Sequence, residues 1–151
     1  MENNAQSAAF FDALADLHRH TVDVLAGFDT MLAKAAPEFR ETVQRYRTLH
    51  SRHATELARL LAEAGREPDH DGSFMGTVNR TVVSLRAAVD DIDADVLPQI
   101  HSGEQHVMDA IGQVVRAAVA TPRLPWADLN VVSDMRRELA SLLSETSPTT
   151  A

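Results

Sequence analysis

The chain has 151 residues, a net charge of −8 at pH 7 and no cysteine. This length favours a single domain. Without cysteine there is no disulfide framework, thiolate nucleophile or cysteine-based zinc site. The negative charge argues against nucleic acid, whose phosphates require a concentrated basic face, and against an anionic membrane surface.

The composition predicts an all-α fold, because β-branched and aromatic residues are sparse beside alanine, leucine, arginine and glutamate. Residues 1–6 contain neither a basic region nor an apolar run, and no stretch approaches the ~20 apolar residues of a transmembrane helix. We expect residues 1–6 to be disordered and the protein to be cytoplasmic.

Two helices are predicted in the first half of the chain, over residues 7–34 and 37–64. Pro37 suits the first turn of the second helix, and Gly65 suits a left-handed C-terminal cap. The break between the two helices is so short that they must form an antiparallel hairpin. Gly27 lies inside the first helix and costs about 1 kcal/mol relative to alanine unless another helix packs closely there.

The second half repeats this arrangement after a long connection. Residues 66–92 are expected to form a crossover with its own short helix over 74–89. Two further helices follow over 93–120 and 126–144, and residues 145–151 form a disordered tail. Pro98 is expected to kink the first turns of the third bundle helix. Two hairpins joined by a long crossover are the connectivity of a ferritin-like four-helix bundle, so we predict one such domain over residues 7–144.

Two histidines interrupt the apolar seam of the second helix. At heptad spacing, the positions expected to face inward are Phe39, Val43, Tyr46, His50, His53, Leu57, Leu60 and Ala64. His50 and His53 stand where a bundle helix normally carries leucine or valine. They therefore belong either to a buried polar layer or to a binding site.

Several short motifs resemble a bacterial family of ferritin-like four-helix-bundle proteins, described only as a domain of unknown function. The similarity covers residues 65–68, 72–80 and 85–88 of the crossover, together with Thr55-Glu56-Leu57 and Ser102-Gly103-Glu104. The chain departs from this family where Asn79 replaces an expected histidine and Val83 an expected aromatic residue. The resemblance implies the fold and implies no substrate or reaction.

The candidate metal ligands are His50, His53 and Glu56 on the second helix, His101 and Glu104 on the third bundle helix, and His18 on the first helix. His50 and His53 lie one turn apart, as do His101 and Glu104. Imidazole and carboxylate groups suit iron, zinc or manganese. The alternative is a hydrogen-bonded polar layer in which Glu104 accepts from a histidine.

An intact ferritin-type di-iron centre is not expected. That centre needs Glu-x-x-His on two bundle helices, and none of the predicted bundle helices contains such a motif. The seams of the first and last helices also carry no carboxylate; the last helix offers Met135 and Leu139 instead. We find no catalytic triad, phosphate-binding loop or dinucleotide fingerprint, and no residue pattern that identifies a small-molecule ligand.

The sequence leaves two main functions open, and a small-molecule pocket between the crossover helix and the bundle, near Gly76, is a third possibility. The first is a non-catalytic bundle that acts through protein association. A homodimer is plausible here because some apolar residues, namely Val22, Val24, Val83 and Val131, fall outside the main seams. The alternative is a metal-binding or redox protein that uses the His/Glu cluster.

Overall fold

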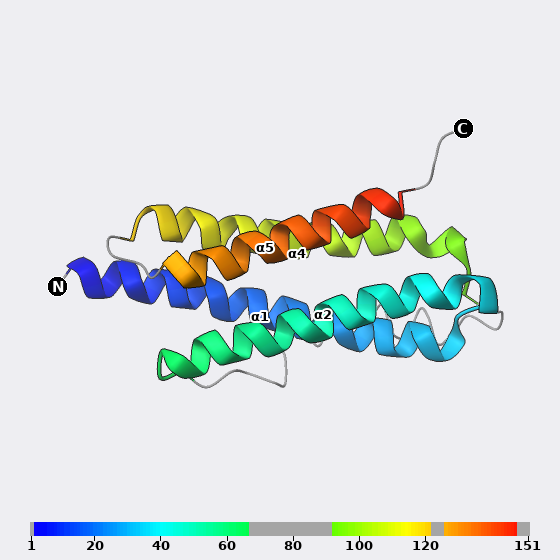
Figure 1. The fold of residues 1–151 in the computed structure, drawn as a ribbon, viewed down its shortest axis with the longest axis horizontal. Coiled ribbons are helices and arrows are strands. Elements are labelled where there is room, and N and C mark those ends of the chain that lie inside the picture. Colours follow the sequence, from blue (N-terminus) through cyan, green and yellow to red (C-terminus); the bar gives the residue numbers. More distant parts are fainter. Residues whose placement is uncertain (1, 67–91, 122–125, 148–151) are drawn as a thin grey trace.

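Four long helices lie side by side as a bundle (Figure 1). The computed structural model describes residues 2–66, 92–121 and 126–147. The helices are α1 (Glu2–Lys34), α2 (Pro37–Glu63), α4 (Leu97–Val119) and α5 (Trp126–Glu145), and a short 3-10 helix, η1 (Ala94–Val96), precedes α4. These elements confirm the predicted all-α bundle with a long connection between its second and third helices. The short helix expected over 74–89 lies outside the described residues.

The first two helices form an antiparallel hairpin through the break at Ala35 and Ala36. Pro37 lies in the first turn of α2, where its missing N–H costs nothing because a first-turn N–H has no partner within the helix. Farther along the hairpin, Arg47 pairs with Asp29 at the surface. An exposed ion pair of this kind contributes little stability, so the hairpin is held mainly by its apolar seam.

The buried seam of α2 follows the predicted heptad. Its positions from Phe39 to Leu60, including both histidines, are buried, and only the last one, Ala64, is exposed. On α1 the predicted inward positions Leu14, Leu17 and Phe28 are buried, and near the start of the helix Phe10 is buried where Phe11 was expected. The other helices complete the core with an apolar stripe at helical spacing. Its members are Leu14, Leu17, Phe28, Ile100, Val107, Ile111, Val114, Val132, Met135, Leu139 and Leu142.

The segment that leads into α4 is fixed to the α1–α2 turn. Ala36 N donates to Ile92 O at 2.8 Å, and Ile92 N donates to Lys34 O at 2.9 Å. Next, the Asp93 carboxylate accepts from Asp95 N at 2.9 Å and caps the start of η1. Because of this clasp, α4 begins at the end of the bundle where α1 finishes.

The directions of the helices follow from this clasp. α4 runs antiparallel to α1, and α5 then returns and ends beside the first half of α2 (Figure 1). α1 packs extensively on both α2 and α4, whereas α5 packs on α4 and meets α2 over a much smaller area. In the described part of the bundle, α2 and α5 therefore approach each other less closely than the pairs α1–α2, α1–α4 and α4–α5.

Two local expectations differ from the structure. α1 begins at Glu2, whereas we expected a disordered N-terminus and a helix only from residue 7. The expected kink at Pro98 is wrong, because α4 begins only at Leu97 and Pro98 therefore lies in its first turn, a position that proline tolerates. Across the described ranges, no helix combines the length and the apolar content needed to cross a membrane.

Candidate functional site

A carboxylate and an imidazole meet in the middle of the bundle. His50 on α2 is 0% exposed and Glu104 on α4 is 1% exposed. The His50 Nε2 atom lies 2.7 Å from Glu104 Oε1, so Nε2–H donates to the carboxylate. The predicted hydrogen bond between a seam histidine and Glu104 is therefore confirmed, and the histidine is His50.

The pair leaves two polar atoms without a partner. Glu104 Oε2 and His50 Nδ1 are both buried, and neither makes a hydrogen bond within the described part of the chain. A buried polar atom without a partner costs about 1–3 kcal/mol. A bound ion or solvent molecule in this layer would therefore gain a polar contact to either atom.

Aromatic rings fix the orientation of the His50 imidazole. The Phe28 ring of α1 stacks on Tyr46 with centroids 5.1 Å apart and on His50 with centroids 5.6 Å apart. His53 approaches His50 edge-on with centroids 6.3 Å apart. Since Tyr46 and His50 lie one turn apart on α2, a single phenylalanine covers both rings and positions Nε2 toward α4.

His53 lies beside a different carboxylate from His50 and makes no hydrogen bond to it. The His53 Nε2 atom lies 3.5 Å from Glu138 Oε1 on α5. Burial is the main reason why the pKa of His53 falls from its ordinary value of 6.5 to about 4, and the nearby His50 lowers it further, whereas Glu138 opposes the fall. His53 is therefore neutral at physiological pH. The last helix does supply a carboxylate beside the histidines, which the sequence-based expectation of Met135 and Leu139 missed.

The remaining candidate ligands do not converge on the His50–Glu104 pair. Glu56 lies at the surface and pairs with Arg59 at 2.9 Å. His101 is half-buried, and its Nε2 atom lies 3.4 Å from Thr146 Oγ1. His18 is buried in α1. The residues that the structure describes contain no group of three or more histidine, aspartate or glutamate side chains that could hold a metal ion. The metal site therefore stays a prediction.

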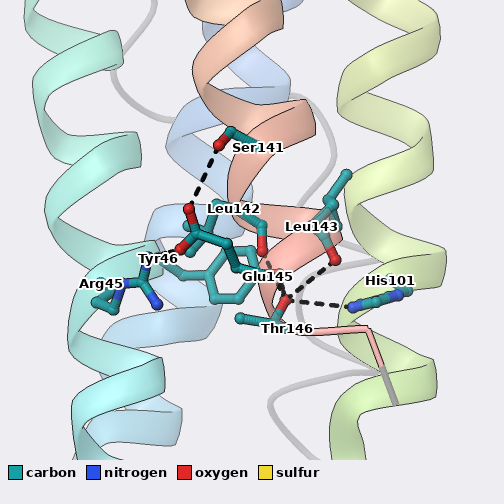
Figure 2. Close-up of polar contacts among 8 residues, drawn as sticks. All are labelled: Arg45, Tyr46, His101, Ser141, Leu142, Leu143, Glu145 and Thr146. Atoms are coloured by element: carbon teal, nitrogen blue, oxygen red, sulfur yellow. Dashed lines mark hydrogen bonds and ion pairs between the residues drawn. The ribbon is translucent and has the colours of Figure 1, made fainter. Parts of the chain in front are cut away.

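The C-terminal end of α5 is attached to two other helices through Thr146 (Figure 2). Tyr46 of α2 lies 2.5 Å from Thr146 Oγ1, and Thr146 Oγ1 in turn donates to Leu142 O at 2.8 Å. His101 Nε2 of α4 approaches the same hydroxyl. Burial raises the pKa of Tyr46, so its phenol stays protonated and donates to Thr146. This clasp joins α2, α4 and α5 at one end of the bundle.

A groove of about 1020 Å³ lies along the loose interface between α2 and α5. Two exposed ion pairs bridge it, one between Arg45 and Glu145 and one between Arg52 and Glu138. Most of the lining residues are polar or charged, with two leucines between the bridges, but most of the lining surface belongs to carbon atoms. Its residues are Pro37, Arg40, Glu41, Gln44, Arg45, Thr48, Leu49 and Arg52 of α2 and Arg137, Glu138, Ser141, Leu142 and Glu145 of α5.

Comparison with protein families identifies one match. The model of the domain of unknown function DUF2383 covers residues 9–117. The chain belongs to this family. The matched segment contains most of α1, all of α2 and nearly all of α4, including both members of the His50–Glu104 pair. In this DUF2383 chain, α5 lies beyond the matched segment. Neither the curated proteins nor the solved structures contain a match.

Sequence reasoning about this DUF2383 domain missed Glu138 and Thr146. Glu138 directly precedes the seam residue Leu139, so a search restricted to seam positions passes over it. Thr146 follows the last residue of α5, in a stretch expected to be disordered. A signal was available in the charge pattern, because Arg45 and Arg52 on α2 are seven residues apart, as are Glu138 and Glu145 on α5. Opposite charges at this matched heptad spacing are typical of two helices that pack side by side.

Proposed function

We propose that this DUF2383 chain is a non-catalytic, cytoplasmic helical bundle that acts by binding another protein, and that it binds through the face formed by α2 and α5. The observation that carries the proposal is the groove of about 1020 Å³ along that face. The other neighbouring helices bury their seams against each other more fully. The antiparallel order of the helices and the long connection after α2 further support a ferritin-like arrangement.

The association we propose depends on polar contacts. Val24 and Val131, which suggested an apolar dimer face, are partly buried and pack against the core. Val83 lies outside the described residues, and among those that are described the only large apolar side chain classed as exposed is Val119. A homodimer stays a prediction. The argument that these valines form an apolar dimer face is weaker, because Val24 and Val131 pack against the core of their own chain. The α2–α5 face offers charged side chains on both sides of a narrow apolar floor, which is typical of a transient interface.

Site-specific crosslinking tests this proposal. A photoreactive amino acid in place of Thr48, an exposed residue in the groove, should give adducts with a defined partner in the cells that make the protein. The matched control replaces Gln113, which is exposed on α4, a helix that contributes no lining residue. Adducts from position 48 alone support the proposal. Adducts of equal yield from both positions, or from neither, overturn it.

The metal-binding alternative has one specific observation in its favour, namely the unpartnered Oε2 of buried Glu104. His50 and Glu104 contact each other directly, so a shared ion would require them to separate and a third ligand to approach. Elemental analysis of untagged protein tests this alternative. About one equivalent of iron, zinc or manganese in the native chain, lost in a His50→Leu/Glu104→Leu variant, would support it. Metal-free protein that also takes up none of these ions would exclude it.

A further inference from the structure

We propose that the α2–α5 groove binds an acidic amphipathic helix of a partner protein. This inference rests on the proposed function, because it names the kind of partner that the same face would bind. It is carried by two observations on the groove, its dimensions and its charge.

The dimensions of the groove suit a helix that lies along it. Its lining on α2 runs from Pro37 to Arg52, a length of about 22 Å at the helical rise. On α5 the lining runs only from Arg137 to Glu145, a length of about 12 Å, so both helices flank the groove over about half of its length. The groove is widely open to solvent. A helix that lies along it would therefore keep its outer face in solvent.

The floor of the groove is apolar only along its centre. Leu49 of α2 and Leu142 of α5 lie in the lining between the two ion pairs that bridge the helices. Both leucines are nearly buried, with exposed fractions of 8% and 6%. A partner helix could set one narrow apolar stripe on this floor, so that its polar flanks would lie against the charged rims.

The charge on the rims indicates the sign of the partner's flanks. Arginine lines both sides of the groove, at Arg40, Arg45 and Arg52 on α2 and at Arg137 on α5. With the glutamates of the lining counted, the groove carries one more positive than negative charge, although the chain as a whole carries −8. An acidic partner is therefore repelled by most of the molecule and attracted at this face.

Two of these arginines are available to a partner without breaking the bundle. Arg40 is exposed and makes no ion pair with any other residue in the described ranges. Arg137 is exposed and pairs only with Asp134 of its own helix, at 2.5 Å. Guanidinium groups bind carboxylates in a two-pronged geometry, so both positions suit glutamate or aspartate on the partner helix.

Binding of designed peptides to the full chain tests this inference. Two fluorescent peptides of about 16 residues, long enough to span the groove, carry the same leucine stripe and differ in their flanks, which are glutamate in one and lysine in the other. Fluorescence anisotropy should show that the glutamate peptide binds at least about tenfold more tightly, and that added salt weakens its binding. Equal binding of the two peptides overturns the inference.

Matched charge reversals locate the site. Arg40→Glu/Arg137→Glu should weaken binding of the glutamate peptide about tenfold or more. Arg116→Glu/Arg136→Glu changes the net charge equally at two exposed positions outside the groove lining and should leave binding nearly unchanged. Circular dichroism checks that both variants stay folded. If the control pair loses as much affinity as the groove pair, the attraction is general and the inference is wrong.

The failure of this inference can be told apart from the failure of the proposed function. Crosslinks from position 48 to a defined partner, with no binding of the glutamate peptide, would overturn the acidic helix and leave the association face intact. A concentration-dependent dimer in sedimentation that the Arg40→Glu/Arg137→Glu variant abolishes would identify a second copy of the chain as the occupant, and that result also overturns the acidic helix. If position 48 gives no crosslinks, the association face itself fails.

Discussion

Two opposing contributions to stability meet in the contact between His50 and Glu104, namely the cost of burying both groups and the gain from their hydrogen bond. Substitutions can separate the two. Removing two ionisable groups from water is costly, and their mutual hydrogen bond recovers part of that cost. We expect Glu104→Leu alone to lower the free energy of unfolding by about 2–4 kcal/mol, because His50 Nε2–H loses its buried acceptor. His50→Leu alone should also destabilise the protein.

The double variant decides how to interpret these losses. His50→Leu/Glu104→Leu should cost clearly less than the sum of the two single changes, since no unpaired polar group remains. Urea denaturation at pH 7 measures all four corners of the cycle. Additive losses would mean that the two side chains are not coupled, contrary to the 2.7 Å contact.

His53 makes stability depend on pH in a defined window. Unfolded His53 binds a proton below about pH 6.5, whereas the folded residue, with its pKa lowered to about 4, stays neutral over most of that range. Between these values the unfolded state binds more protons, so stability should fall as the pH falls, by about 1–3 kcal/mol from pH 7 to pH 4.

The variant His53→Phe should lose this component of the pH dependence. His20, whose pKa is lowered by burial, and Glu145, whose pKa is lowered by Arg45, also make stability fall in acid. Their contributions are the same in both proteins and cancel in the comparison. Urea midpoints at a series of pH values provide the measurement. Parallel profiles for the two proteins would show that His53 is not the group responsible.

Two glycines play opposite roles in their helices. Gly27 lies inside α1, and a Cβ built there meets nothing within 4 Å, so the sequence-based condition of a closely packed helix is not met. Gly65 follows α2 with a φ of 76°, and a Cβ there also has open space. The two positions therefore do not differ in the space available for a side chain. They differ in backbone conformation, because Gly27 is helical and Gly65 has a positive φ.

We expect alanine to have opposite effects at these two positions. Gly27→Ala should stabilise the protein by up to about 1 kcal/mol, because alanine has the higher helix propensity. Gly65→Ala should destabilise it by about 1 kcal/mol, because an L-residue resists the left-handed region. Thermal unfolding of both variants gives the signs. A gain at Gly65 or a loss at Gly27 would contradict this account.

The hydrogen bonds of Thr146 hold the end of α5 against α2, and their contribution to stability can be measured. Tyr46→Phe and Thr146→Val should each cost about 0.5–1.5 kcal/mol, because each removes the hydrogen bond between α2 and the end of α5. The double variant should cost little more than one single change. Ser147→Ala is the control, since the Ser147 hydroxyl donates to Leu143 O at the end of α5 and makes no hydrogen bond to α2 or α4. A control loss equal to that of Thr146→Val would argue against the clasp.

At the scale of the whole molecule, the bundle is unevenly packed. α1 packs extensively on both α2 and α4, whereas α5 packs less extensively, through its buried seam, two exposed ion pairs and the Thr146 clasp. We therefore expect amide hydrogen exchange to be slower in the interior turns of α1, α2 and α4 than in α5. Exchange followed by mass spectrometry measures this order. Equal protection in all four helices would contradict the loose α2–α5 interface.

The sequence by itself determined the elements and most of the core. Strong 3.6-residue periodicity, Pro37 and Gly65 are local signals, so the limits of α2 and its buried seam from Phe39 to Leu60 followed from the order of residues. The same pattern placed His50 and Glu104 on inward faces. Periodicity was less informative at the ends of helices, where the start of α1 and the position of Pro98 in α4 differ from expectation.

Only the tertiary structure decided which inward groups meet. Side-chain partners on different helices depend on the rotation and the axial shift of each helix, and neither quantity is written in a single helix's pattern. For this reason His50 rather than His53 contacts Glu104, Glu138 lies beside His53, and Thr146 joins three helices. The groove between α2 and α5 also depends on how the helices are placed. Each of the two helices has a clear apolar seam, but how closely the seams pack depends on where the other helices hold them.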